Sequence, residues 1–131
     1  MGKKEILAII PARGGSKGIK HKNMVLVDGK PLIQYTIEAA KESRYITRAI
    51  VNSDDEEILR FAESQDIETV VRPPELAQDN TPMKDVICDQ LSRLRQKENY
   101  VPDIILLLQP TSPLRTGKHI DEAMEKLIHS E

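Results

Sequence analysis

Four cations and three glycines crowd together in one short stretch of the sequence. The cations are Arg13, Lys17, Lys20 and Lys22, and the glycines are Gly14, Gly15 and Gly18. Glycine allows a backbone to turn sharply and to approach a ligand closely. Backbone N–H groups can then surround phosphate oxygens while the cations neutralise their charge. The stretch therefore favours polyphosphate binding over the plainer alternative, a flexible basic loop at the surface.

A buried strand is expected to position this stretch. Residues 6–10 read ILAII, a run typical of a strand covered on both faces, and Pro11 ends it because proline has no N–H for a sheet ladder. Ligands of open α/β sheets bind at the carboxyl ends of the strands, which is where the glycines follow. The spacing excludes the G-x-x-x-x-G-K-[ST] motif of P-loops and the G-x-G-x-x-G motif of dinucleotide-binding folds.

The rest of the sequence alternates between strand and helix patterns. Strands are predicted at residues 6–10, 46–51, 67–71 and 104–108, and helices that begin or are capped at Pro31, Ser53, Met83 and Thr116. This alternation is typical of the α/β class, with a three-layer αβα, Rossmann-like fold and a mainly parallel sheet. The loops at residues 11–23, 72–82 and 109–115 leave the carboxyl edge of that sheet, so they are expected to converge on one cleft.

Local patterns give sharper expectations for the helix ends. Pro31 is placed at the favoured first position of the first helix. Ser53 and Glu56 have the spacing of a capping box. This box explains Asp54 and Asp55 better than a metal site does, because acidic side chains suit a helix N-terminus.

Burial is predicted from the spacing of the apolar residues. The run at residues 104–108 is expected to be covered on both faces. Cys88 lies in a helical pattern, where inert packing is favoured over nucleophilic catalysis. The helix over residues 83–96 is expected to bury Met83, Ile87, Leu91 and Leu94, and the last helix Ile120, Ala123, Met124, Leu127 and Ile128.

Length and charge bound the classes of function. A chain of 131 residues is expected to form a single domain, and its 19 basic against 21 acidic residues argue against wholesale nucleic-acid binding. No apolar stretch reaches the ~20 residues of a membrane span, and no signal peptide is expected. A single cysteine excludes an internal disulfide, so we expect a cytoplasmic location. From the balanced charge and the short apolar stretches we expect no nucleic-acid or membrane partner. No histidine and cysteine spacing suggests zinc.

Four motifs together resemble those of one enzyme family. ARGGSKGIKHKN at residues 12–23 is similar to the motif ARGGSKGIPRKN that opens the acylneuraminate cytidylyltransferases, also called CMP-sialic acid synthetases, and departs from it at Lys20 and His21. VNSDDEEI at residues 51–58 resembles the family's VSTDDEEI, and RPPELA at residues 72–77 resembles its RPxELA. LLQPTSPLRTG at residues 107–117 is similar to the last of these motifs throughout.

The resemblance implies an αβα fold of the nucleotide-diphospho-sugar transferase type. It also implies transfer of CMP from CTP to a nonulosonic, sialic-type sugar acid with release of pyrophosphate, assisted by Mg²⁺. Pseudaminic or legionaminic acid is the alternative sugar. Members of the family are longer, and their second half carries an Asp-x-Asp metal site, much of the sugar pocket and the segment that forms homodimers. Residues 1–131 then correspond to one nucleotide-binding domain, which is expected to be inactive alone or to act as a CTP-binding module.

The resemblance implies roles for individual residues. Arg13 and Lys22 are the expected catalytic cations, because the charge that builds on the leaving pyrophosphate must be neutralised. Arg72 is assigned to the cytosine end of the nucleotide. The expected nucleotide-binding residues are Ala12, Arg13, Gly14, Gly15, Ser16, Lys17, Lys22, Asn23, Arg72 and Thr81, the sugar-binding residues are Gln109, Ser112 and Arg115, and no metal ligand is expected in this chain.

Plainer roles stay open for several of these residues. Asn23 can cap a loop or helix as well as contact the ribose or base. Arg115 can bridge loops to an acidic helix, and Lys20 is best interpreted as a solvated surface lysine. Gln109 is expected to be held in the cleft by the apolar run before it, and a structural glutamine in the core is its alternative.

Overall fold

Four parallel strands form the central sheet of the computed structural model, which describes residues 4–14, 22–78, 80–110 and 116–129. In spatial order the strands are β5 (Glu68–Val71), β4 (Arg48–Ser53), β1 (Ile6–Pro11) and β6 (Ile104–Leu107). Ile9 of β1 pairs with Ile50 on one side and with Leu107 on the other. The predicted parallel sheet is therefore confirmed, with the strand before the glycines at its centre.

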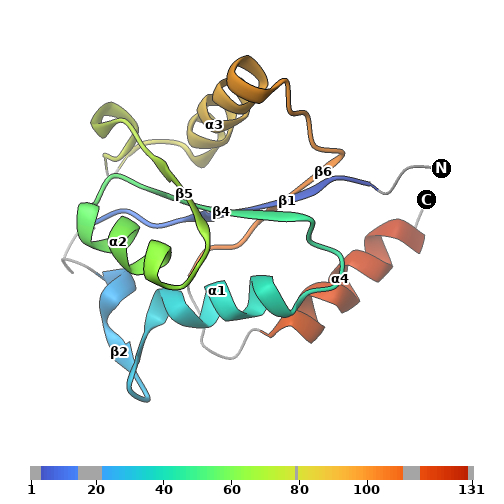
Figure 1. The fold of residues 1–131 in the computed structure, drawn as a ribbon, viewed down its shortest axis with the longest axis horizontal. Coiled ribbons are helices and arrows are strands. Elements are labelled where there is room, and N and C mark those ends of the chain that lie inside the picture. The colour runs from blue at the N-terminus through green and yellow to red at the C-terminus, as the bar shows by residue number, and fades with distance from the viewer. Residues whose placement is uncertain (1–3, 15–21, 79, 111–115, 130–131) are drawn as a thin grey trace.

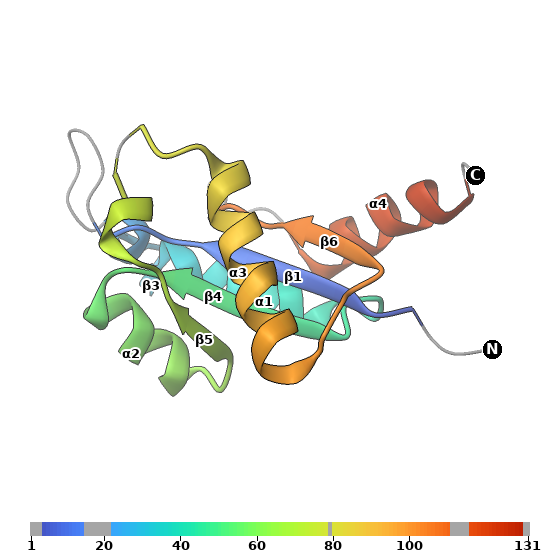
Figure 2. The same ribbon diagram turned by 90° about the horizontal axis from the view of Figure 1, so that it is seen from above.

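Helices cover both faces of this sheet (Figures 1 and 2). One face is covered by α3 (Met83–Glu98), and the other by α1 (Leu32–Glu42), α2 (Glu56–Ser64) and α4 (Gly117–His129). The three-layer prediction is confirmed.

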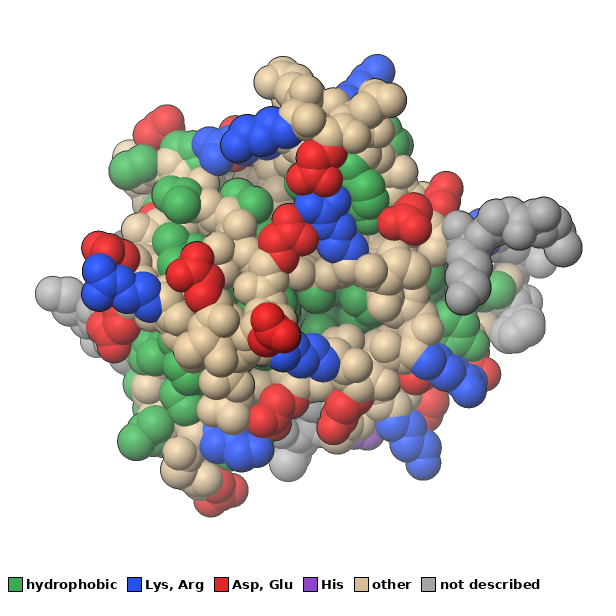
Figure 3. All heavy atoms as spheres, in the orientation of Figure 1, with side chains coloured by type: hydrophobic (Ala, Val, Ile, Leu, Met, Phe, Trp, Pro, Cys, Tyr) green, Lys and Arg blue, Asp and Glu red, His purple; other side chains and the backbone are tan. Residues whose placement is uncertain are grey.

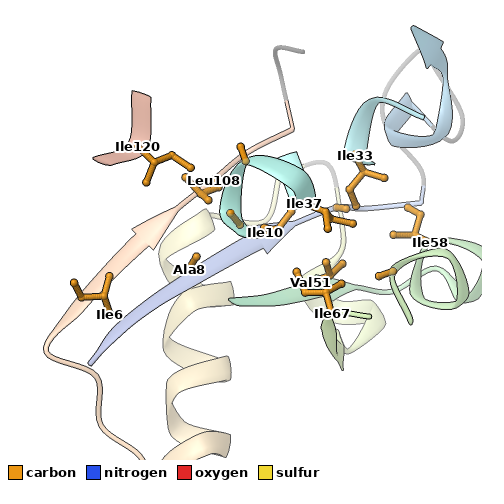
Figure 4. Close-up of a cluster of buried hydrophobic side chains, with 14 of the residues drawn as sticks. Ile6, Ala8, Ile10, Ile33, Ile37, Val51, Ile58, Ile67, Leu108 and Ile120 are labelled. Atoms are coloured by element: carbon orange, nitrogen blue, oxygen red, sulfur yellow. The ribbon is translucent and has the colours of Figure 1, made fainter. Parts of the chain in front are cut away.

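Alternate residues of β1 enter the two cores that these layers enclose. Ile10 packs with Ile37 of α1 (Figure 4), whereas Ile9 packs with Leu94 of α3. Ile9 and Ile10 are both fully buried. Burial of one such side chain is worth roughly 1.5–3 kcal/mol, so β1 is held rigidly at the base of the loop that follows it.

A short hairpin separates the glycine-rich stretch from α1. A turn of 3₁₀ helix, η1 (Lys22–Met24), leads to β2 (Leu26–Val27), which pairs antiparallel with β3 (Lys30–Pro31). Asp28 and Gly29 both have positive φ, as the tightest hairpin turns require. Pro31 is extended and pairs with Leu26, so α1 begins one residue later than predicted.

β4 also differs from its prediction, by two residues at each end. It runs over Arg48–Ser53 instead of residues 46–51. The polar residues at its end stay in the ladder because their carbonyls accept hydrogen bonds from both neighbours. The Ala12 N–H donates to the Asn52 carbonyl at 2.9 Å, and the Arg72 N–H donates to the Ser53 carbonyl at 2.7 Å. Apolar spacing alone does not contain this information.

The predicted capping box of Ser53 and Glu56 is wrong. α2 begins at Glu56, and its cap is Asp55, whose carboxylate accepts from the Glu57 N–H at 2.9 Å. The Ser53 hydroxyl instead accepts from the Asp55 N–H at 3.0 Å. Asp55 is therefore a helix cap, as its acidic character indicated. Asp54 does not cap the helix and instead contacts Gly14.

The buried face of α3 corrects two further expectations. Val86, Gln90 and Leu94 are its buried residues, so the prediction is confirmed for Leu94 but missed Val86 and the amide Gln90. The predicted Ile87 and Leu91 are partly buried against the same core. Cys88 lies between Val86 and Gln90 and is exposed, because positions two apart on a helix point in different directions. The predicted packing of Cys88 is therefore wrong.

The last strand and helix are less buried than predicted. β6 lies at the edge of the described sheet, and its four residues are half-buried instead of covered on both faces. Ile120 and Met124 of α4 are buried, whereas Ala123 and Leu127 are exposed. α4 packs closely on α1, and Gly117 permits this approach because a Cβ there would lie 2.3 Å from the Cβ of Glu42. The Thr116 hydroxyl accepts from the His119 N–H at 3.3 Å, which confirms the predicted cap.

Candidate active site

The strand order reverses between β1 and β6. From β1 the chain moves outward to β4 and β5, and it then returns across the sheet to β6 on the other side. The crevice outside the carboxyl ends of the strands at such a reversal is where open α/β sheets bind ligands. In Figure 1 the start of α2 and the chain after β5 lie at the same end of the sheet as the carboxyl end of β1. The topology therefore brings the predicted loops to one edge.

Gly14 is clamped against the two aspartates that follow β4. Its N–H donates to Oδ1 of Asp54 at 3.0 Å. A Cβ built on Gly14 would lie 2.5 Å from the Cβ of Asp55, a distance that real Cβ atoms essentially never show. Only glycine fits this close approach. The first glycine of the stretch is therefore held in place by the two aspartates that follow β4.

Arg13 and Asn23 fasten the two ends of the glycine-rich stretch. The Nδ2 of Asn23 donates to the Arg13 carbonyl at 3.1 Å, which ties the end of the stretch back to its start. Nη1 of Arg13 donates to the Ala77 carbonyl at 3.3 Å, and this contact joins the loop after β1 to the segment after β5. Asn23 thus has the loop-closing role that the sequence left open. The predicted convergence of these two loops is confirmed.

Arg72 lies directly after β5 and is almost completely buried, with 2% of its surface exposed. Its Nε donates to Oδ1 of Asn52 at 2.7 Å, and its Nη2 reaches the Asn52 carbonyl at 3.4 Å. Burial lowers the pKa of Arg72, the carboxylate of Asp54 raises it, and the nearby charge of Arg13 lowers it. Two arginines and one carboxylate are therefore within electrostatic reach of one another at this edge, and arginine stays protonated in proteins.

Of the other residues predicted to bind the nucleotide, three lie in the described part of the chain, directly after β1, in a turn and at the start of η1. Ala12 is buried and continues the β1 ladder to β4. Thr81 closes a turn, because its hydroxyl accepts from the Gln78 N–H at 3.1 Å. Lys22 opens η1. Gly15, Ser16 and Lys17 lie outside the described residues, as do Ser112 and Arg115 of the predicted sugar site.

Gln109 lies just beyond the apolar run of β6. β6 ends at Leu107, Leu108 is still bonded to the Ile9 carbonyl, and Gln109 beyond it is exposed. It belongs to the carboxyl edge, as predicted, but the strand does not bury it. Its alternative as a structural glutamine in the core is therefore wrong.

Three polar residues of this edge were not predicted from the sequence. Asp54 contacts the first glycine, while Asn52 and Gln90 lie behind Arg72 in the core. The burial of Gln90 could have been predicted, because it lies four residues from both Val86 and Leu94 and so shares their face of α3. Asn52 lies near the end of β4, and Asp54 directly follows that strand, at the end of the sheet where parallel sheets carry functional side chains.

The described residues offer no clustered metal ligands, and their charges are mixed. The described part of the chain contains no group of three or more His, Cys, Asp and Glu side chains able to hold a metal ion. No helix among residues 4–14, 22–78, 80–110 and 116–129 is long and apolar enough to cross a bilayer. Basic and acidic side chains are interspersed over the face seen in Figure 3, which fits the nearly balanced charge of the sequence.

Comparison with known proteins agrees with this arrangement. A family model described as "Cytidylyltransferase" matches residues 7–131. The chain belongs to the cytidylyltransferase family. It is 43% identical over 121 residues to an N-acylneuraminate cytidylyltransferase of Escherichia coli O18:K1:H7, and this match covers 92% of the chain and 28% of that protein.

Two further comparisons place this cytidylyltransferase chain among its relatives. It is 39% identical to a CMP-N,N'-diacetyllegionaminic acid synthase of Legionella pneumophila, over 92% of the chain and 52% of that protein. The structure of CMP:2-keto-3-deoxy-manno-octonic acid synthetase complexed with CTP has the same fold, with a TM-score of 0.77 at 20% identity over 95% of this chain and 48% of that one. The chain thus spans between about a quarter and a half of the length of these proteins.

Proposed function

We propose that the protein transfers CMP from CTP to a nonulosonic, sialic-type sugar acid and releases pyrophosphate. One observation carries this proposal: the glycine-rich stretch begins at the carboxyl end of the central strand and is fastened to the segments after β4 and β5. Gly14 is bonded to Asp54 after β4, and Arg13 to Ala77 after β5. A loop anchored at its base in this way can present its N–H groups to a triphosphate.

The chemistry requires neutralisation of the triphosphate and of the leaving pyrophosphate. In the proposed reaction the anomeric hydroxyl of the sugar acid attacks the α-phosphorus, and the bond from that phosphorus to the β-phosphate oxygen breaks. Arg13 and Lys22 neutralise the charge that develops on the leaving group, assisted by donors from Gly15, Ser16 and Lys17. Arg72 donates to the base, and Asn23 and Thr81 border the nucleotide.

Mg²⁺ is part of the proposal as a partner of the CTP phosphates. A divalent cation supplies charge neutralisation of the phosphate oxygens when it is bound. The described residues hold no metal-ligand cluster, so we assign it no ligand within them. A relative of the same fold, Rv0371C of Mycobacterium tuberculosis, has been solved as a complex with manganese.

Residues 1–131 are proposed to be one domain, the nucleotide half of the enzyme. We propose further that this half alone binds CTP without turning it over, and that the enzyme is a cytoplasmic homodimer. The alternative function is a CTP-binding module without catalysis. Pyrophosphate release by residues 1–131 alone would overturn the assignment as a nucleotide half.

The substrates can be tested by following pyrophosphate release. The whole protein is incubated with CTP, Mg²⁺ and a panel of N-acetylneuraminic, legionaminic, pseudaminic and 3-deoxy-octulosonic acids. We expect release with at least one of the first three acids. Turnover with 3-deoxy-octulosonate alone, or with a hexose 1-phosphate, would contradict the proposed sugar class.

Asp54 provides a prediction about the loop itself. Asp54→Ala removes the acceptor of the Gly14 N–H, and CTP binding measured by calorimetry is expected to weaken about three- to tenfold, as for one lost hydrogen bond. Asp54→Asn keeps an acceptor and removes a negative charge beside the triphosphate. It is therefore expected to bind CTP at least as tightly as the unaltered protein. Equal weakening by both variants would contradict the role of this hydrogen bond.

Gln109 provides a prediction about the sugar acid. Gln109→Ala is expected to lower the use of the sugar acid by about tenfold to a hundredfold, because a hydrogen bond to a charged partner is worth ~1.5–3 kcal/mol. Binding of CTP and the melting temperature are expected to stay close to those of the unaltered protein, since Gln109 is exposed. A matching loss of CTP binding would remove Gln109 from the sugar site.

A further inference from the structure

The partners of Arg72 continue into the core as a chain of two amides. Nε of Arg72 donates to Oδ1 of Asn52, and Nδ2 of Asn52 donates to Oε1 of Gln90, both at 2.7 Å. Asn52 and Gln90 are completely buried, the first at the end of β4 and the second on α3. The two amides therefore connect Arg72, directly after β5, to α3.

The chemistry of arginine fixes the direction of this chain. A guanidinium donates and never accepts, so Asn52 must turn its oxygen to Arg72 and its nitrogen to Gln90. Gln90 must then accept with Oε1, and its Nε2 is left without a hydrogen-bond partner among the described residues. If the amide of Asn52 were reversed, its NH₂ would face the N–H of Arg72, and two buried groups would lose their partner. Arg72 thus sets the orientation of Asn52, and Gln90 supplies the buried acceptor that the NH₂ of Asn52 needs in this orientation.

We propose that Asn52 and Gln90 are positioning residues that aim the guanidinium of Arg72 at a carbonyl of the bound base. The inner nitrogens Nε and Nη2 are used by Asn52, whereas Nη1 donates to no described residue. Because the guanidinium is planar, fixing its inner edge fixes the direction of the remaining N–H groups. The proposal rests on the proposed function, since it requires a nucleotide in the cleft.

The direct test is Gln90→Leu, which removes the acceptor and changes the side-chain volume little. The buried NH₂ of Asn52 then lacks its acceptor, which loosens the side chain that holds Arg72, and we expect calorimetry to show about tenfold weaker CTP binding. Inorganic triphosphate has no base, so its binding is expected to stay unchanged. Gln90→Glu keeps an acceptor for Asn52 and is expected to bind CTP nearly as tightly as the unaltered protein.

A double-mutant cycle separates positioning from support of the core. If Gln90 acts through Arg72, Gln90→Leu has no further effect on CTP binding in an Arg72→Ala background. The matched control is Leu94→Val, one turn along the same buried face of α3 and outside the amide chain. It is expected to lower the melting temperature without changing the ratio of CTP to triphosphate affinity.

Four results would overturn the proposal. Equal weakening of CTP and triphosphate binding by Gln90→Leu would make Gln90 a core residue only, and additive losses in the double variant would show that it does not act through Arg72. If the unaltered protein binds no CTP, the proposed function itself fails. If it binds CTP and Gln90→Leu binds it equally well, only the positioning role fails.

Discussion

Replacing Lys22 by alanine is expected to lower kcat for pyrophosphate release by about a hundredfold or more, with a smaller change in KM for CTP. Loss of one preorganised group that stabilises developing charge costs about this much, or ~2.7 kcal/mol of transition-state stabilisation. Lys22 opens η1 directly after the glycine-rich stretch, and Asn23 beside it is tied to the Arg13 carbonyl at 3.1 Å. The backbone that carries Lys22 is thereby held at the base of the loop.

Steady-state kinetics of the whole protein decide between two roles of this lysine. A group that stabilises only the transition state lowers kcat, whereas one that binds ground and transition states equally raises KM alone. Lys20 in the same stretch provides the matched control, because Lys20→Ala is expected to leave both constants nearly unchanged. An unchanged kcat in Lys22→Ala would remove Lys22 from the catalytic residues.

Replacing Gly14 by alanine is expected to reduce CTP binding by at least about tenfold and kcat with it. The new Cβ would lie 2.5 Å from Cβ and Oδ2 of Asp55. Asp55 cannot simply swing away, because it caps α2 through the Glu57 N–H. The loop must therefore shift, which also breaks the bond from the Gly14 N–H to Asp54. A displacement of about 1 Å in a group that positions substrate can cost a hundredfold in rate.

Gly29→Ala serves as the control for this variant. Gly29 has a positive φ of 82°, and an added Cβ there meets nothing within 4 Å. We expect it to lower the melting temperature through backbone strain and to leave CTP binding unchanged. Normal CTP binding by Gly14→Ala would show that the clamp on the first glycine is dispensable.

The sequence was sufficient for those parts of the fold that repeat a pattern. The apolar run before Pro11, the alternation of strands and helices and the cap at Thr116 were predicted and are present. They depend on residues close together in the chain or on burial of whole segments. The convergence of the loops after β1 and β5 could be predicted for a related reason, because parallel strands put their carboxyl ends at one edge.

The failed predictions concern contacts between residues far apart in the sequence. Asp54 is a plausible helix residue by itself, and only the fold brings its carboxylate to the N–H of Gly14. β4 extends through Asn52 because the carbonyl of that residue accepts a hydrogen bond from the Ala12 N–H of the neighbouring chain segment. Cys88 fits a helical pattern equally well on either face of α3. It is exposed because the face of α3 that packs on the sheet is the one with Val86 and Gln90. In each case tertiary contacts decided between alternatives that are locally equivalent.

The most direct test of the central claim is a titration of ¹⁵N-labelled residues 1–131 with CTP, followed by amide chemical shifts. A nucleotide site at the carboxyl edge predicts that the shifts of Gly14, Asp54 and Arg72 change together and saturate, while amides at the amino end of the sheet, such as Arg48, do not change. Saturable changes confined to the pocket of about 340 Å³ between β5 and α3, which is lined by Thr69 and Arg93, would contradict the site. No saturable change with CTP at any amide would contradict nucleotide binding by this domain.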